Sequence, residues 1–319
     1  MTCPVLRRCR VAGLAGWFIA LTFAICLQPC SATAEAPLAM SQIAQGVYVY
    51  RGADAEATAE NAGGIANIGF IVGDQSVAVI DTGGSLMVGQ ALLAAIRQVT
   101  DLPIQYVINT HFHPDHILGN AAFVAERPIF VGHVNLPPAL RARQASYLAR
   151  AQEVLGSIAS EDWFIVPQHL VSGREVIDLG RRGLVLEAYP TAHTDSDLTV
   201  LDEATGTLFA GDLVFLERIP AIDGSIVGWL AALDRLKGVP ARRVVAGHGP
   251  ASAAWPAALA DELRYLELIA QETRQILAKG GTLQEATASV GLTEKNRWRL
   301  FDSYNARNVT AAYTELEWE

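Results

Sequence analysis

The sequence predicts a mixed α/β (α+β) fold that ends in a helical extension. Short apolar runs with strand-like alternation recur between residues 43 and 246, separated by segments with helical spacing such as Ser85–Val99. Several of these strands run into loops that begin with His or Asp. After Pro250 the strand pattern stops and amphipathic helical patterns replace it. With 319 residues, 51% of them hydrophobic, the chain is long enough to bury a sizeable core.

The first 34 residues predict a signal peptide that is cleaved after Ala34. Three arginines precede Val11–Leu27, an almost uncharged apolar run, and Ala32-Thr33-Ala34 has the small-x-small pattern of a cleavage site. An uncleaved N-terminal anchor is the alternative, since the run is close to the shortest length that spans a bilayer. We therefore expect an exported, periplasmic protein.

The positions of the cysteines and the net charge exclude further classes of protein. All four cysteines lie in the leader, so the mature chain has no disulfide and no cysteine metal ligand. Loss of the leader's three arginines leaves 21 basic residues against 33 acidic ones, a net charge of −12. Such an acidic chain argues against nucleic acid as a partner.

The first half of the mature chain alternates predicted strands with helices. The strands are apolar runs and cover residues 43–50, 67–74, 76–80, 104–109 and 129–131. The helices have apolar residues at helical spacing and cover residues 85–99, 117–123 and 139–155. Asp54–Gly64, rich in Ala, Glu and Gly, predicts an exposed loop.

The second half contains further strands and then only helices. Its strands cover residues 174–179, 184–190, 198–201, 207–210 and 243–246. Residues 256–319 predict a helical extension, with helices over 256–277, from Thr282 with a capping box to Glu285, and over 297–313. We expect this extension to pack on the chain's own core, the alternative being a partner protein.

The stretch Thr110–His116 carries the strongest functional signal. His111, His113, Asp115 and His116 fall within six residues, directly after a predicted buried strand. Imidazole nitrogen and carboxylate oxygen are the usual ligands of zinc-like metal ions. Alternate side chains of an extended chain share a face, so the first two histidines can reach one ion and the other pair a second. The stretch therefore predicts a two-metal site at the end of a strand.

Three more candidate ligands also end predicted strands. They are His193, Asp212 and His248. A single His or Asp after a strand is more often a turn or cap residue than a ligand. However, the loops at the ends of strands converge when the strands lie in packed sheets, and ligand sites form where they meet. Together with the first loop they predict one shared site. The remaining histidines, His133 and His169, are interpreted as structural.

Three aspartates are candidates for an outer shell around the ligands. Asp81 ends strand 76–80, and its spacing favours a turn residue. If that strand lies beside strand 104–109, Asp81 can instead orient a ligand from behind. Asp195 and Asp197 flank His193. They either support the ring of His193 or form a solvated acidic turn, and the sequence favours neither interpretation.

This pattern resembles the metallo-β-lactamase-fold hydrolase superfamily. The resemblance rests on His111-x-His113-x-Asp115-His116 followed by His193, Asp212 and His248, and it covers residues 41–255. It implies a four-layer αββα sandwich over residues 35–255, after the signal peptide (1–34) and before the helical extension (256–319). By position, it implies a first metal at His111, His113 and His193, a second at Asp115, His116 and His248, and Asp212 as the bridge.

Finer features separate the members of that superfamily. The presence of Asp212 and the absence of mature cysteine resemble glyoxalase II and related thioesterases rather than lactamases proper. Residues 192–199, 210–215 and 219–225 are similar to the quinoprotein relay system zinc metallohydrolases, which are exported and associated with periplasmic quinoprotein dehydrogenases. The resemblance implies a hydrolase of ester- or thioester-type bonds in a small-molecule substrate, with a quinoprotein dehydrogenase or its cytochrome as partner. A β-lactamase and a non-catalytic metal-binding accessory protein are the alternatives.

The ligand set implies two divalent metal ions and a hydrolytic chemistry. Zinc is expected first, although iron and manganese also suit a set of histidines and carboxylates. Two ions that share a water lower its pKa toward about 7 and so supply a bridging hydroxide. Asp115 is expected to orient this hydroxide and shuttle its proton. Arg218 is the only cation between Leu213 and Trp229, which predicts an anionic group on the substrate.

Overall fold

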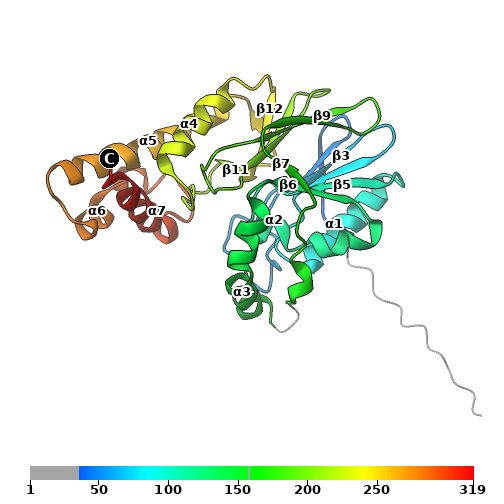
Figure 1. Ribbon diagram of the computed structural model, residues 1–319, viewed down its shortest axis with the longest axis horizontal. Coiled ribbons are helices and arrows are strands. Elements are labelled where there is room, and N and C mark those ends of the chain that lie inside the picture. Colours follow the sequence, from blue (N-terminus) through cyan, green and yellow to red (C-terminus); the bar gives the residue numbers. More distant parts are fainter. Residues whose placement is uncertain (1–35, 157–158) are drawn as a thin grey trace, which may run out of the picture. The chain divides into compact units, whose positions relative to one another are not determined.

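Two β-sheets and the helices outside them make up the part of the chain that the computed structural model describes, residues 36–156 and 159–319 (Figure 1). The predicted signal peptide and its cleavage point after Ala34 lie outside these residues. None of the described helices combines the length and the apolar character that a membrane crossing requires.

The first sheet has seven strands in the spatial order β1-β2-β3-β4-β5-β6-β7. Their bounds are β1 Ser41–Ala44, β2 Val47–Tyr50, β3 Ile68–Val72, β4 Val77–Ile80, β5 Ile104–Ile108, β6 Ile129–His133 and β7 His169–Val171. Strands β1 to β4 are antiparallel, and β4 to β7 run parallel. The parallel pairing of β4 and β5 meets the condition under which Asp81 lies beside the histidine loop.

The second sheet has six strands in the order β13-β12-β11-β10-β9-β8. Their bounds are β8 Arg174–Asp178, β9 Gly183–Ala188, β10 Leu198–Asp202, β11 Thr207–Phe215, β12 Arg243–His248 and β13 Ala253–Ala254. Only β11 and β12 pair in parallel. Their carboxyl ends therefore lie together at one edge of this sheet.

The sheets pack face to face, with helices on both outer faces. One buried cluster joins Val49, Ile80 and Ile108 of the first sheet to Leu186 and Phe209 of the second. A second cluster covers the outer face of the first sheet with α1 (Leu86–Val99), and a third covers the second sheet with α4 (Ile226–Lys237), α5 (Ala260–Ala278) and α7 (Phe301–Leu316). This arrangement confirms the predicted αββα sandwich (Figure 1).

The helices follow the sequence pattern closely in the larger elements. Their bounds are α1 Leu86–Val99, α2 Pro114–Ile117, α3 Leu136–Leu155, α4 Ile226–Lys237, α5 Ala260–Ala278, α6 Leu283–Ser289 and α7 Phe301–Leu316, with short 3-10 helices at Asn120–Glu126, Glu161–Trp163, Ala257–Leu259 and Leu292–Glu294. Ser85 caps α1, and Thr282 with Glu285 forms the predicted capping box of α6. Residues Tyr265 and Ile269 of α5 and Val309 of α7 share a core with the second sheet, so the extension packs on the chain itself.

Three predicted elements differ from the structure. The single strand expected over 43–50 is a hairpin, because Gly46 at φ +66° turns the chain between β1 and β2. The helix expected over 117–123 is α2 followed by a 3-10 helix. Strand β11 continues through Gly211 to Phe215, so Asp212 lies within a strand and not in the loop after it.

Candidate metal centre

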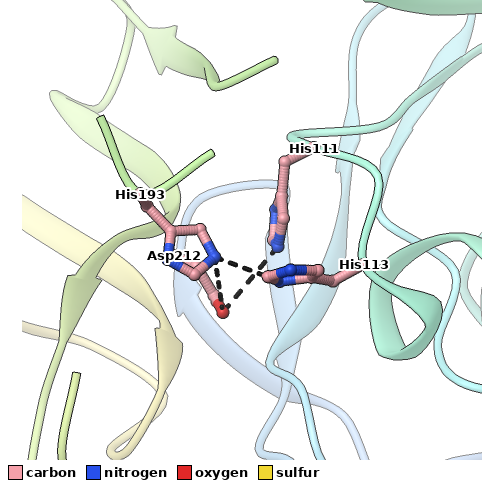
Figure 2. A group of neighbouring side chains, drawn as sticks. All are labelled: His111, His113, His193 and Asp212. Carbon is pink, nitrogen blue, oxygen red and sulfur yellow. Dashed lines mark hydrogen bonds and ion pairs between the residues drawn. The ribbon is translucent and has the colours of Figure 1, made fainter. Parts of the chain in front are cut away.

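Seven side chains meet where the carboxyl ends of strands from both sheets come together. They form two groups, His111, His113, His193 and Asp212, and Asp115, His116 and His248. Within each group, one ligand atom per residue lies within 4.8 Å of every other. Figure 2 shows the three histidines of the first group directed at the carboxylate of Asp212. The structure thus brings together all seven residues that the sequence predicts as ligands.

The first loop is shaped by its own residues. Pro114 stands at the first position of α2, where its fixed φ suits a helix start, and Asp115 and His116 follow on that turn. Asn109 and Asn120 exchange side-chain hydrogen bonds of 2.8 and 3.1 Å across the loop. The buried amide pair holds the four ligands of this loop relative to β5.

Two glycines let the second sheet approach that loop. Gly211 has φ +52° in a strand irregularity, and a Cβ there would lie 2.6 Å from Thr110. A Cβ on Gly247 would lie 1.8 Å from Oδ1 of Asp212. Any side chain at either position would therefore separate the sheets or displace the carboxylate.

Asp212 is the residue that both groups share. Its Oδ2 lies 3.8 Å from His111 Nε2, 3.5 Å from His193 Nε2 and 3.4 Å from His248 Nε2. Its Oδ1 lies 3.2 Å from His116 Nε2. Asp115 Oδ2 lies 3.3 Å from His248 Nε2, on the side of the second group. A single buried carboxylate therefore faces ligand nitrogens of both groups.

Each of the five histidines has a partner on its outward-facing nitrogen. His116 Nδ1 pairs with Asp81 Oδ2 at 2.7 Å, and His113 Nε2 with Asp223 Oδ2 at 3.0 Å. The other three pairs are His111 Nδ1 with Thr110 Oγ1 at 3.0 Å, His193 Nδ1 with the Ala221 carbonyl at 2.7 Å, and His248 Nδ1 with the Ile65 carbonyl at 3.0 Å. Carboxylate, carbonyl and hydroxyl partners hold the hydrogen on the outer nitrogen, which directs the inner nitrogen to the centre of the cluster as a candidate metal ligand. The inner nitrogens of His113 and His193 lie 3.1 Å from each other there, within hydrogen-bond distance.

Asp81 extends this support to both groups. Thr110 donates from Oγ1 to Asp81 Oδ2 at 2.7 Å and from its backbone N–H to Oδ1 at 2.8 Å. With its hydroxyl hydrogen committed to Asp81, Thr110 accepts from His111 Nδ1. Asp81 thus holds His116 directly and His111 through Thr110.

Buried atoms without partners test whether a cation fits here. Among the described residues, His111 Nε2, His116 Nε2 and Asp212 Oδ1 are buried and make no hydrogen bond of acceptable geometry. Buried polar atoms are rarely left unpaired, because the loss of hydration is costly. All three face the centre of the cluster, and the donor set contains only imidazole nitrogen and carboxylate oxygen. These residues fit two divalent metal ions.

The protonation states of the clustered side chains favour the binding of cations. Burial lowers the pKa of His111 well below its usual value and that of His193 to about 3, so both rings are neutral ligands. Burial would raise the pKa of Asp212, but His248 and His116 hold it well below its usual value. Burial opposes protonation of His116, yet the carboxylates of Asp212 and Asp81 raise its pKa, and metal binding displaces such a proton.

The outer-shell role expected for Asp195 and Asp197 is not found. Neither carboxylate bonds to the ring of His193, because the Ala221 carbonyl already occupies Nδ1. Asp197 instead accepts from the backbone and hydroxyl of Thr194 at 2.9 and 2.6 Å, and burial raises its pKa to about 8. It shapes the loop that carries His193, whereas Asp195 accepts only at its backbone carbonyl, from Asn135.

Other residues of the site have no clear signal in the sequence. Asp223 bonds to His113 from the loop after β11. The sequence marks this residue only by its position in 219–225, one of the segments that are similar to the quinoprotein relay system hydrolases. Tyr304 and Arg307 of α7 line the cavity in front of the metal groups, about 310 Å³ in volume, together with Arg218. His133 and His169 lie elsewhere, bonded to Asn135 and Glu175.

Comparison with known proteins places the site in a family context. The family model described as "Metallo-beta-lactamase superfamily" matches residues 61–248, more than half of the chain. This span contains all seven clustered residues.

Two solved structures share the fold. A metallo-beta-lactamase from Pontibacter korlensis has a TM-score of 0.59 and 19% identity, covering 72% of this chain and 99% of that one. The structure of TMB-1 has a TM-score of 0.57 and 17% identity, covering 72% and 97%.

One curated relative matches over a short stretch. The linear primary-alkylsulfatase of Pseudomonas sp. (strain ATCC 19151) is 39% identical over 67 residues, which are 21% of this chain and 13% of the relative. The match therefore spans about an eighth of the relative's length.

Proposed function

The chain belongs to the metallo-beta-lactamase superfamily, and from this premise we propose that it is an exported hydrolase of ester- or thioester-type bonds that uses two divalent metal ions. We further propose that it serves a periplasmic quinoprotein dehydrogenase system, as its resemblance to the quinoprotein relay system zinc metallohydrolases implies.

One observation carries the proposal of a two-metal hydrolase. The carboxylate of Asp212 lies between two groups of ligand nitrogens, with His111 Nε2 and His116 Nε2 buried and unpartnered beside it among the described residues. A structural cluster of histidines would satisfy these nitrogens with hydrogen bonds. The arrangement instead leaves lone pairs converging on two positions next to a cavity.

The protein groups divide the chemical work. Two bound divalent ions supply hydrolysis with an acidified water near neutral pH. Asp212 faces both ligand groups and fixes their spacing. Asp115 lines the cavity, and the neighbouring His116 and His248 outweigh its burial and hold its pKa below the usual value. Its carboxylate is therefore ionised at neutral pH and can accept a hydrogen bond from a reacting group in the cavity.

Elemental analysis combined with turnover tests the shared role of Asp212. We expect about two metal ions per chain in the unmodified protein and loss of at least one in Asp212→Ala, with turnover reduced by about 100-fold or more. His116→Ala is expected to lose the second ion. Asp234→Ala removes an exposed carboxylate on α4 and is the matched control. Two ions per chain in Asp212→Ala would contradict the bridging role.

A substrate panel tests the bond that is cleaved. The metal-replete protein is assayed with an ester, a thioester, nitrocefin and an alkyl sulfate. The alkyl sulfate is included because of the 67-residue match to an alkylsulfatase. Turnover restricted to esters or thioesters supports the proposal, turnover of nitrocefin favours a β-lactamase, and no turnover at all favours a non-catalytic accessory protein.

Export and partnership have separate tests. Cell fractionation and N-terminal sequencing are expected to find a periplasmic chain that begins at Glu35. Pull-down with a quinoprotein dehydrogenase or its cytochrome is expected to retain the protein. A cytoplasmic full-length chain, or no retention by either partner, would contradict these parts of the proposal.

A further inference from the structure

Two cavities join into one cleft in front of the metal centre. The cavity at the ligands, about 310 Å³, and a neighbouring cavity of about 350 Å³ have six lining residues in common, namely Ile65, Pro114, Asp115, Tyr147, Tyr304 and Arg307. The first cavity is the metal arm of the cleft and the second is its outer arm. The cleft therefore continues from the ligands past Tyr304 and Arg307 into the outer arm.

The metal arm contains a buried cation without a carboxylate partner. Arg218 is only 5% exposed, and no described carboxylate lies within ion-pair distance of it. It donates to the hydroxyl of Tyr304 at 3.0 Å and to the carbonyl of Ala55 at 3.3 Å. Its approach to His248 Nδ1 at 3.4 Å adds no acceptor, because that nitrogen carries the hydrogen given to Ile65.

A second cation lies beside it. Arg307 is exposed, lines both arms and places its guanidinium 5.5 Å from the ring centre of Tyr304. It too forms no ion pair with any described residue. Two acids border this junction: Asp115 lines both arms, and the exposed Glu56, which accepts from the hydroxyl of Tyr304 at 3.1 Å, lines only the outer arm. Both guanidiniums lie near the side chain of Tyr304, Arg218 in the metal arm and Arg307 where the arms meet.

The charge of the loaded site makes these cations significant. The carboxylates around the metal positions are Asp81, Asp115, Asp212 and Asp223, four negative charges against the four positive charges of two divalent ions, and a bridging hydroxide adds a fifth negative charge. Arg218, buried beside this set, has no carboxylate partner of its own among the described residues. A buried charge without a counter-charge is costly, so an anionic ligand group at this junction is stabilised.

The outer arm is apolar along one wall. Leu118 at the end of α2 and Ala151, Val154 and Leu155 of α3 line it together with Ile65, and Arg150 of α3, which pairs with Glu153, lines it as well. Leu118, Ile65 and Ala151 are buried residues whose side chains nevertheless border the cavity. Methylene groups transferred from water to such a wall stabilise a bound ligand.

From this arrangement we propose that the substrate is an amphiphilic anion. Its anionic group lies against Arg218 and Arg307 beside the bond that is cleaved, and its apolar portion extends along α3 in the outer arm. This inference rests on the proposed hydrolase function and adds the substrate class to it.

Four esters separate the two features of the ligand. They are 4-nitrophenyl acetate, 4-nitrophenyl octanoate and the 3-carboxy-4-nitrophenyl ester of each acid, with rates normalised to their hydroxide-catalysed hydrolysis. The carboxylated octanoate is expected to have the highest kcat/KM in the metal-replete protein. A carboxylated ester that is no better than the neutral one, or an octanoate no better than an acetate, would overturn the inference.

Matched variants assign the preference to residues. Arg307→Ala is expected to lower the preference for the carboxylated ester about 10-fold, and Arg307→Lys to recover most of it, with metal content unchanged. Arg141→Ala removes an exposed arginine of α3 that lines neither arm, and it is expected to leave the ratio unchanged. Unchanged discrimination in Arg307→Ala would contradict the role of that residue.

The apolar wall has its own pair of variants. Val154→Asn is expected to lower the ratio of octanoate to acetate about 5-fold. Val227→Asn makes the same change at an exposed position of α4 and controls for the change in helix propensity. An equal ratio in these two variants would exclude α3 as the wall that contacts the chain.

Binding distinguishes failure of this inference from failure of the proposed function. The hydrolase proposal fails if neither these esters nor any substrate of the panel above is hydrolysed. In that case calorimetry compares 4-octanamidobenzoate with octananilide, two amides that differ by a carboxylate. Tighter binding of the former, weakened about 10-fold by Arg307→Ala, supports the ligand class without catalysis. Equal binding of both, or binding of neither, refutes it.

Discussion

Replacing Asp81 with Asn removes the charge behind the metal ligands without straining the chain. Asp81 has φ +55°, a conformation that Asn tolerates and Ala does not, so Asp81→Asn is the informative substitution. The amide oxygen can still accept from the Thr110 backbone. The amide NH₂ then faces His116 Nδ1, which at present donates to Oδ2 at 2.7 Å.

The magnitude follows from the tautomer of His116. Two donors cannot face each other, so the ring either loses its outer partner or moves its hydrogen to Nε2, where it blocks the metal. Loss of such an outer partner weakens metal binding by about 10- to 100-fold, or about 1.4 to 2.8 kcal/mol. The second ion is affected most, because His111 of the first group depends on Asp81 only through Thr110.

Chelator competition measures this effect directly. Zinc is removed stepwise by a chromophoric chelator, and the two dissociation constants are fitted for the unmodified protein, for Asp81→Asn and for Asp74→Asn. Asp74 is an exposed hairpin aspartate that pairs with Arg181 and provides the same chemical change far from the ligands. Equal constants for the second ion in Asp81→Asn and in the control would refute the reasoning.

Three further substitutions test the scaffold of the site. Gly211→Ala combines φ +52° with a Cβ 2.6 Å from Thr110, and it is expected to cost about 2 kcal/mol or more, measured by urea unfolding of the metal-free protein. Thr282→Ala removes a capping box and is expected to cost about 1 kcal/mol with unchanged metal content. Burial raises the pKa of Glu262 well above its usual 4.5. Above pH 4.5 the unfolded chain therefore releases a proton that the folded state still holds. The contribution of this group to the free energy of unfolding is lost as the pH rises above 4.5. Glu262→Gln keeps an acceptor for the Phe215 amide. Between pH 5 and pH 8 its free energy of unfolding is expected to decrease less than that of the unmodified protein. The same decrease in both proteins would show that other groups cause it.

The ligands could be predicted from the sequence because each has a local sign. Histidine and aspartate at the ends of apolar strands are visible without knowing how the strands pack, and all seven converge. Asp81 was recognisable for the same reason, although its partner was not. The pattern of strands and helices predicts a mixed α/β fold with a helical extension, whereas the sandwich itself was implied by the family resemblance of the ligand motifs.

The remaining features depend on packing and leave no local sign. The acceptor for His193 is the backbone carbonyl of Ala221, which any residue type could supply, so the flanking Asp195 and Asp197 were the visible but wrong candidates. Asp223 meets His113 across 110 residues of chain. Arg307 reaches the cleft because α7 packs against α5 and, through Asn308, against the loop after β11, contacts that helical periodicity does not specify.

The division of the ligands between two sheets determines when metal can be acquired. A chain in which only the first sheet has formed presents His111, His113, Asp115 and His116, but lacks the other three, and His113 lacks Asp223. Such an intermediate holds an ion with too few, poorly oriented donors to compete with other chelators. Tight binding of both ions is therefore expected only after the two sheets have packed together, so the ions available at that stage of folding are the ones that compete for the site.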